Sequence, residues 1–284
     1  MSSEEGPATK KAKPSTELRA LGFCGADDSV DPKLLGIFAH LYPLVEFGVL
    51  FRPDKEGEPR YASSEWVKRL GEVASKSSQS SENGGKSKMK LAAHFCGARV
   101  NEVLQGDDAF ISSLSDLGFQ RVQINATAVN GVDTSRLAES VDSFLSVVTK
   151  HPELEFIIQK NAETRPLWEP LLSTESDLAG KEGHLPKNMS MLVDESKGTG
   201  VLASSWPSPP DGYEIGYAGG IGPGNITTVL NDVLEAGNGR KIWIDMESSL
   251  RSTKNGKDIF DLEKCYKVIN AVCDAGILSH PDFV

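Results

Sequence analysis

The feature that most constrains the fold is a regular alternation of short apolar segments with longer amphipathic ones. Short segments that are apolar throughout are typical of strands buried on both faces of a parallel sheet. Strict alternation of such strands with helices indicates a parallel sheet, closed or open. The predicted strands are Leu21–Gly25, Val45–Phe51, Lys90–Cys96, Arg121–Thr127, Glu155–Lys160, Met189–Asp194, Glu214–Ala218 and Lys241–Met246.

The amphipathic segments between these strands predict helices, and several begin at Ser, Thr, Asp or Asn, which cap free N–H groups. About eight strand–helix pairs favour closure into a barrel over an open sheet. No GxGxxG follows the first strand, which argues against a dinucleotide-binding fold. We therefore predict an α/β chain folded as a single-domain (β/α)8 TIM barrel. The predicted helices are Asp31–Leu41, Ser64–Ala74, Asp107–Leu117, Thr134–Thr149, Thr164–Leu172, Asn225–Ala236 and Asp261–Ala275.

The length of 284 residues fits one such barrel, which uses ~250, with short additions. Residues 1–16 are rich in Ser, Glu, Lys and Pro without a periodic apolar pattern, so we predict a disordered tail. Residues 75–88 contain a low-complexity stretch and are predicted to be a surface insertion. The barrel itself is assigned to residues 17–284.

Charge and cysteine content exclude several classes of protein. The formal net charge of −10 and the pI of about 5.1 disfavour binding to nucleic acid or anionic membranes. No apolar run reaches the ~18 residues of a membrane helix, and no secretory signal pattern follows the N-terminus. The four cysteines lack the CxxC spacing of a zinc site. We expect a cytoplasmic protein with reduced thiols, monomeric or homodimeric.

Polar residues at the predicted strand ends are the first candidates for chemistry, because barrel enzymes act at that face. Cys24 ends the first strand, where a thiol can serve as a base once ionised or stay inert. The polar residues of the third to fifth strands either line a pocket or hydrogen-bond within the barrel. They are His94, Cys96, Gln123, Asn125, Gln159 and Asn161.

The last three strands lead into a carboxylate and into glycine-rich loops. Asp194 ends the sixth strand, where it is well placed for proton transfer. The turn GGIGPGN after the seventh strand and DMESSLR after the eighth stand where barrels often bind phosphate through backbone N–H groups. The alternative is that these glycines only permit tight turns.

These motifs together resemble a divergent phosphoribosylanthranilate isomerase, the barrel enzyme of tryptophan biosynthesis. GFCG matches the family's KICG and puts Cys24 on its catalytic cysteine, and EPRYAS puts Arg60 on the arginine that holds the anthranilate carboxylate. LVDESKGTG with Trp206 matches the sixth strand and loop and puts Asp194 on the catalytic acid. AGGIGPGN and DMESS, then GKD, match the seventh and eighth strands in order.

The resemblance implies an aldose–ketose isomerase that carries out an Amadori rearrangement of a small phosphorylated substrate. Cys24 would be the general base and Asp194 the general acid. The resemblance implies no metal and no organic cofactor. The predicted substrate-binding residues are Arg60, His94, Asn125, Gly198, Thr199, Gly200, Gly219, Gly220, Asp245, Ser248 and Ser249.

Departures from the family pattern keep other functions open. Gly22 replaces a lysine that would favour the thiolate, and Glu247 replaces a phosphate-binding serine. LAAHFCG replaces the usual third strand, and Asn125 replaces a histidine. One alternative is a barrel that acts on another phosphorylated sugar or nucleotide by a different isomerisation or lyase step, with His94 as acid or base. The other is a barrel that binds without catalysing.

Overall fold

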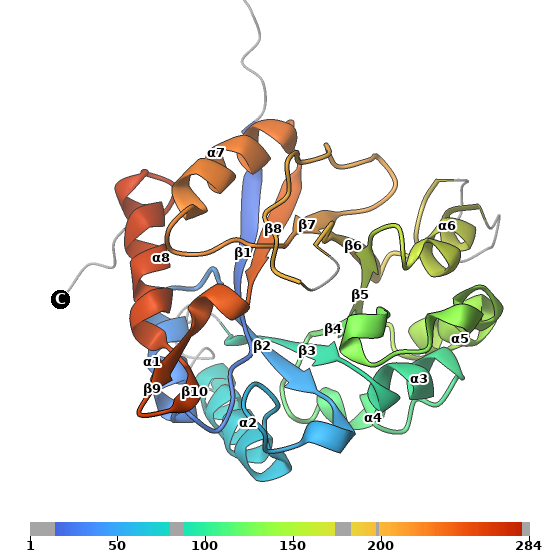
Figure 1. Ribbon diagram of the computed structural model, residues 1–284, viewed down its shortest axis with the longest axis horizontal. Helices are drawn as coiled ribbons and strands as arrows, with labels where there is room; N and C mark the ends of the chain where they lie inside the picture. The colour runs from blue at the N-terminus through green and yellow to red at the C-terminus, as the bar shows by residue number, and fades with distance from the viewer. Residues whose placement is uncertain (1–14, 80–87, 174–182, 197–198, 280–284) are drawn as a thin grey trace, which may run out of the picture.

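The computed structural model describes residues 15–79, 88–173, 183–196 and 199–279. Eight parallel strands close into a barrel in chain order, and β1 pairs with both β2 and β8 (Figure 1). The predicted (β/α)8 barrel is therefore confirmed. The strands are β1 Glu17–Cys24, β2 Val45–Phe51, β3 Lys90–Phe95, β4 Arg121–Ile124, β5 Glu155–Lys160, β6 Met189–Val193, β7 Ile215–Tyr217 and β8 Lys241–Met246.

Helices surround the strands and bury their apolar faces against them (Figure 1). Their capping follows the sequence, since Asp31 and Asp261 accept backbone hydrogen bonds at the starts of α1 and α8. The helices are α1 Pro32–Leu41, α2 Ser64–Gln79, α3 Ala98–Leu104, α4 Ile111–Leu114, α5 Val141–Lys150, α6 Arg165–Ser173, α7 Ile226–Ala236 and α8 Leu262–Asp274. Short 3-10 turns are η1 Pro53–Lys55, η3 Ala128–Asn130, η4 Thr134–Ser140 and η5 Ser248–Leu250.

Three regions differ most from the predicted elements. The helix predicted over Thr134–Thr149 begins as the 3-10 segment η4, and its α-helical part, α5, starts only at Val141. The helix predicted over Asp107–Leu117 is only the single turn α4, while α3 just before it was not predicted. After β8 the chain forms an antiparallel hairpin of β9 Arg251–Lys254 and β10 Lys257–Phe260, where no strands were predicted. Asn255 and Gly256 turn the hairpin with positive φ angles of 53° and 74°, the conformation that an Asn–Gly pair favours.

The barrel interior is filled in layers below its mouth. Side chains alternate along a strand, so Ala20 shares the inward face of β1 with Cys24. Ala20, Ile157, Leu192 and Trp243 form an apolar cluster separate from the core under the helices. Arg121 places its guanidinium carbon 4.2 Å from the centroid of the Trp243 ring. This packing closes the barrel below and leaves a floor for a site at the mouth.

The structure describes only the ends of the predicted tail and of the predicted insertion. Residues 1–14 and 80–87 lie outside the described residues. Thr16 belongs to the barrel, because its hydroxyl donates to the Leu234 carbonyl at 2.8 Å and accepts from the Gly239 N–H. Helix α2 continues to Gln79, five residues past its predicted end at Ala74. Among the described residues, no helix combines the length and apolar character needed to cross a membrane.

Candidate active site at the barrel mouth

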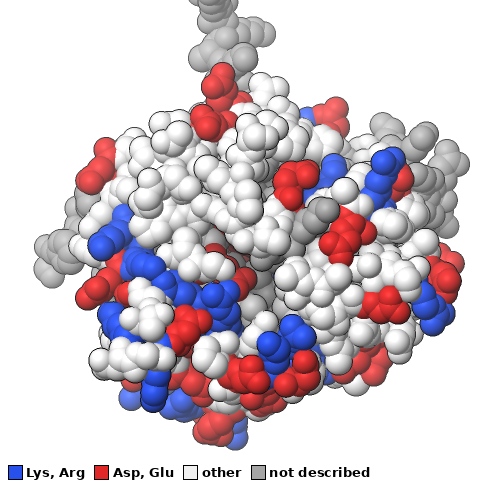
Figure 2. Space-filling model, in the orientation of Figure 1, with Lys and Arg blue, Asp and Glu red and all other residues white. Residues whose placement is uncertain are grey.

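A cavity of about 490 Å³ opens at the carboxyl ends of the strands. Figure 2 shows this face hollowed near its centre, with acidic atoms inside the hollow and Lys and Arg atoms along one side of its rim. Each barrel strand, or the residue just after it, contributes a side chain to the lining. These residues are Cys24, Leu50, His94, Gln123, Gln159, Asp194, Ala218 and Asp245.

Most of the residues predicted from the sequence line this one cavity. Thr199 does not line it, and its hydroxyl donates to the Ser196 carbonyl at 2.7 Å. Gly198 lies outside the described residues. The predicted residues that line the cavity are Cys24, Arg60, His94, Asn125, Asp194, Gly200, Gly219, Gly220, Asp245, Ser248 and Ser249.

The thiol of Cys24 and the imidazole of His94 lie next to each other on the cavity floor. Their Sγ and Nε2 atoms are 3.8 Å apart, and both residues are buried. Gly48 of β2 stands between their strands, and a Cβ there would lie 2.8 Å from Sγ and 2.9 Å from Nε2. A glycine at this position lets the two side chains reach each other.

The surroundings hold this pair in its neutral form. Burial raises the pKa of the Cys24 thiol well above its ordinary value, and the nearby carboxylates of Asp245 and Glu247 raise it further. Burial also lowers the pKa of His94 to about 3, with a contribution from Arg121. Gly22, which replaces the lysine that would favour the thiolate, is thus consistent with a Cys24 that stays a neutral thiol at neutral pH.

Asp245 of β8 completes a compact group with these two side chains. One donor atom each of Cys24, His94 and Asp245 lies within 4.8 Å of the others. Asp245 is 6% exposed, and burial raises the pKa of its carboxyl to about 7, helped by Glu46. A Cβ on Gly22 of the paired strand would lie 1.9 Å from Asp245 Oδ1. A larger residue at position 22 would displace this carboxylate.

Asp194 lies on another part of the wall, directly after β6. Its carboxylate accepts hydrogen bonds from Gln159 Nε2 at 2.6 Å, from the Ser196 N–H at 3.1 Å and from the Ser196 hydroxyl. In the closed sheet, β7 and β8 separate β6 from β1. Cys24 and Asp194 therefore flank one cavity from strands that are not neighbours.

Arg60 stands at the rim and is already paired with carboxylates. Its guanidinium lies 3.2 Å from Glu247 and 3.4 Å from Asp258, and it donates to the Ser248 hydroxyl at 3.1 Å. Burial raises the pKa of Glu247, while Arg60 and Arg251 oppose that shift. Glu247 therefore faces the arginine that the resemblance assigns to a substrate carboxylate.

The glycine turn after β7 has features of a tight turn and also N–H groups without an acceptor among the described residues. Gly219 and Gly220 have positive φ angles of 104° and 64°, and their N–H groups donate to no described residue. A Cβ on Gly220 would lie 2.5 Å from the Leu202 nitrogen, so the loop after β6 packs on this turn. Ser249 is occupied, since its hydroxyl donates to the Ile221 carbonyl.

Six polar residues of the lining are not among the predicted site residues: Tyr61, Gln123, Asn130, Gln159, Ser196 and Glu247. The carbonyl oxygens of both glutamine side chains are buried and accept no hydrogen bond from a described residue. Gln123 Nε2 donates to Asn125 Oδ1 at 2.9 Å, which fixes the Asn125 amide. The alternation of polar residues at the strand ends was the available signal, but it also fits hydrogen bonding within the barrel.

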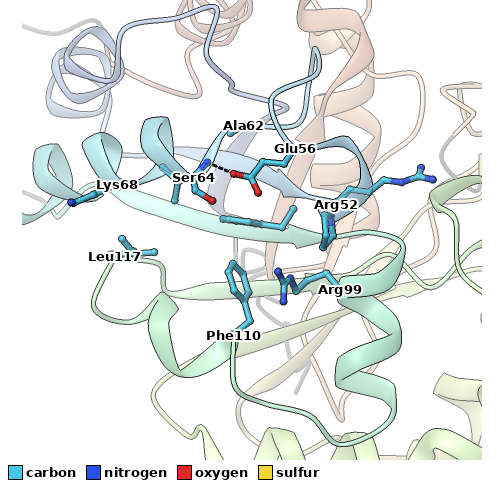
Figure 3. A pocket seen from close by; sticks show the side chains of 11 residues that line it. Arg52, Glu56, Ala62, Ser64, Lys68, Arg99, Phe110 and Leu117 are labelled. Atoms are coloured by element: carbon cyan, nitrogen blue, oxygen red, sulfur yellow. Dashed lines mark hydrogen bonds between the residues drawn. The ribbon is translucent and has the colours of Figure 1, made fainter.

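A second hollow of about 110 Å³ lies at the side of the barrel, by the loop after β2 (Figure 3). Glu56 there accepts a hydrogen bond from the Ser64 N–H at 2.6 Å. The Arg99 guanidinium lies 3.8 Å from the centroid of the Phe110 ring. No predicted site residue lines this hollow, so the barrel mouth is the candidate active site.

Comparisons with known proteins assign no family and no function to the chain. No protein-family model and no curated protein matches the chain. The catalytic domain of Thermobifida fusca endoglucanase Cel5A (E5) is 14% identical over 92% of this chain and 77% of that one, with a TM-score of 0.41. The carboxyl transferase domain of Rhizobium etli pyruvate carboxylase, with pyruvate, is 12% identical over 80% of this chain, with a TM-score of 0.44. The chain spans 40% of that second protein's length.

Proposed function

We propose that this barrel is an isomerase that moves protons on a small sugar-like substrate bound in the mouth. The observation that carries the proposal is that Cys24 and Asp194 line the same cavity, with Asp245 on the strand next to Cys24. Phosphoribosylanthranilate is the first substrate to test, because the resemblance in sequence points to an aminoaldose phosphate. The reaction would be its Amadori rearrangement to the aminoketose.

Opposed acid and base groups suit this chemistry. Asp194 would give a proton to the ring oxygen as the ring opens, and a base near Cys24 would take the proton from the second sugar carbon. The free carbonyl oxygens of Gln123 and Gln159 are acceptors for sugar hydroxyl groups. The cavity of about 490 Å³ falls within the ordinary size of a small-molecule site.

Cys24 and Asp245, which lie on the same wall of the cavity, are the two candidates for the general base. The resemblance favours Cys24, but burial keeps its pKa high and so opposes the thiolate. The carboxyl of Asp245, with a pKa of about 7, matches the value that suits proton transfer near neutrality. Loss of activity in Asp245→Asn with activity kept in Cys24→Ser would assign the role to Asp245.

The charges of the mouth favour a second candidate, in which the barrel catalyses the aldose–ketose isomerisation of a sugar without a carboxylate or phosphate. Arg60 is paired with Glu247 at 3.2 Å, and Asp194, Asp245 and Glu247 all line the cavity. Three carboxyl groups around one arginine repel an anion unless some of them are protonated. A neutral aldose would meet no such repulsion.

The test is turnover by the full-length protein with a panel of substrates. Phosphoribosylanthranilate, aldose phosphates and free aldoses are each incubated with it, and ketose products are followed by NMR. We expect one member to turn over and Asp194→Asn to lower kcat by about 10²–10⁴-fold. Asp142→Asn is the matched control, because Asp142 is an exposed residue of α5. Turnover of no member, or an unchanged rate in Asp194→Asn, would reject the proposal.

A further inference from the structure

We propose that Cys24, His94 and Asp245 form a binding site for one divalent transition metal, best matched by Zn²⁺, with its fourth position open to the cavity. All three residues are buried and line the barrel mouth. The site stands on the geometry of this group and does not depend on the isomerase reaction. It departs from the expectation, drawn from the sequence resemblance, of a mouth without metal ligands.

The distances within the group are close to those of a tetrahedral site. Ligand atoms on a tetrahedral Zn²⁺ with sulfur and nitrogen donors lie about 3.5 Å apart. Cys24 Sγ and His94 Nε2 are 3.8 Å apart, and the donor atoms of all three residues fall within 4.8 Å of one another. Small rotations of the three side chains bring these atoms to bonding distance.

Two glycines make room for the group. A Cβ on Gly48 would contact both Cys24 Sγ and His94 Nε2, and a Cβ on Gly22 would overlap Asp245 Oδ1. The strands that carry these glycines therefore leave the space between the three donors free of side chains. Three residues from β1, β3 and β8 can converge on one point only because of this.

A second observation is that Asp245 has no hydrogen-bond partner among the residues that the structure describes. Its carboxylate is 6% exposed, lines the cavity, and accepts no hydrogen bond from any described residue, with Oδ1 fully buried. Arg121 is a buried cation below the mouth, but it is paired with Glu46 at 2.8 Å and Glu155 at 3.2 Å. Buried carboxylates are normally paired or bound to a metal. Because Asp245 has no such partner among the described residues, its carboxylate is available to bind a metal.

The donor set identifies the class of metal. Sulfur, nitrogen and oxygen donors from Cys, His and Asp are those of zinc sites, whereas Mg²⁺ and Ca²⁺ take oxygen ligands. Three protein ligands with an open fourth position are typical of catalytic zinc, which polarises a carbonyl oxygen or activates water. One thiolate and one carboxylate also balance the charge of the dication.

Binding would change the role of Cys24. A thiol loses its proton to solvent when it coordinates the metal, and the Asp245 carboxylate would be a ligand too, so neither candidate base would be free to accept a substrate proton while the metal is bound. Asp194 lies outside the group of donors and stays available for proton transfer. The ligand expected at the open position is a carbonyl or hydroxyl oxygen of a small polar molecule.

Metal binding is measured directly on the chelator-treated full-length protein. Zn²⁺ is titrated against a chromophoric chelator, and Co²⁺ is added separately to record its absorption spectrum. We expect one equivalent of Zn²⁺ and a thiolate-to-cobalt charge-transfer band. Cys24→Ser and Asp245→Asn should each weaken Zn²⁺ binding at least about ten-fold, the loss that even outer-sphere changes cause. Cys24→Ser should also lose the cobalt band.

Cys96→Ser is the matched control, because Cys96 is equally buried near the end of β3 but outside the group. It should keep both the affinity and the cobalt band. Circular dichroism checks the fold, and Asp245→Asn provides the test if Cys24→Ser unfolds. Less than one equivalent in the wild type, or wild-type affinity in the folded variants, overturns the site. No substrate is involved, and Asp194→Asn should bind Zn²⁺ normally, so failure here is distinct from failure of the isomerase proposal.

Discussion

At the scale of single residues, Asp245 is the group whose charge the fold perturbs in a way that stability can report. Burial raises the pKa of its carboxyl from 3.8 to about 7. Between these values the folded protein holds a proton that the unfolded chain has lost. Its contribution to stability therefore falls as pH rises from about 4 to about 7, and reaches its lowest level above the folded pKa.

Asp245→Asn should remove this pH dependence. The raised pKa spans about 3 units, which at 1.36 kcal/mol per unit sets an upper limit of about 4 kcal/mol. We expect the variant to gain stability over the wild type as pH rises from 5 to 8, by up to about 3 kcal/mol, because about 2 of these units lie above pH 5. Urea unfolding with a chelator present at both pH values measures the difference. A gap between the two proteins that does not change with pH would contradict the prediction, and Asp142→Asn should show no such change.

At the scale of elements, the β9–β10 hairpin is tied to the loop after β1 by one buried arginine. Arg251 has a side chain that is 2% exposed and lies 2.7 Å from Asp27 and 2.9 Å from Asp258. It also donates to the Gly25 carbonyl at 2.6 Å. Asp27 in turn accepts the Arg60 N–H at 2.6 Å, so the same contacts position the rim of the mouth.

Arg251→Met should destabilise the barrel strongly. The change leaves Asp27 buried with a lost ionic partner, and removing one member of a buried ion pair costs about 3–5 kcal/mol. Arg136→Met is the matched control, because its pair with Glu139 is exposed and contributes less than about 1 kcal/mol. Chemical unfolding of both variants compares the two. Equal losses would show that the Arg251 contacts do not hold the hairpin in place.

The sequence predicted the elements that carry a strong local pattern. The bounds of β2, β5 and β8 match their predicted ranges, because each contains a short, mostly apolar stretch with polar residues or a turn beside it. Helix α3 was missed since it is short and follows β3 after only two residues, Cys96 and Gly97. The hairpin was missed although Asn255–Gly256 is a strong turn signal, because its flanking residues are largely polar.

The candidate site was predictable only in part, for a related reason. Strand ends could be read along the chain, so Cys24, His94, Asp194 and Asp245 were all singled out. Contacts between side chains on different strands could not be predicted from the sequence. Asp245 fits beside Gly22 because of the register in which β8 pairs with β1. The contact of Glu247 with Arg60 depends on how two loops far apart in the sequence come together.

At the scale of the whole molecule, the barrel is held closed by the seam between its first and last strands. β1 pairs with β2 on one side and with β8 on the other, so every strand has two neighbours. Leu21 and Phe23 on β1 are fully buried under the helices. Loss of β1 would open the sheet at two edges and expose the core of the whole domain.

Two N-terminal deletions separate the tail from this seam. Removal of residues 1–14 takes away most of the predicted disordered tail. It should leave the midpoint of thermal unfolding within about 2 °C of the wild type, less than the shift that a loss of about 1 kcal/mol causes in a chain of this size. Removal of residues 1–24 takes away β1 as well, and should abolish the cooperative transition altogether. Circular dichroism melts of the two proteins measure both outcomes. A cooperative transition in the longer deletion would mean that β2 to β8 fold without closing, because β8 would then have to be stable with its β1 edge unpaired.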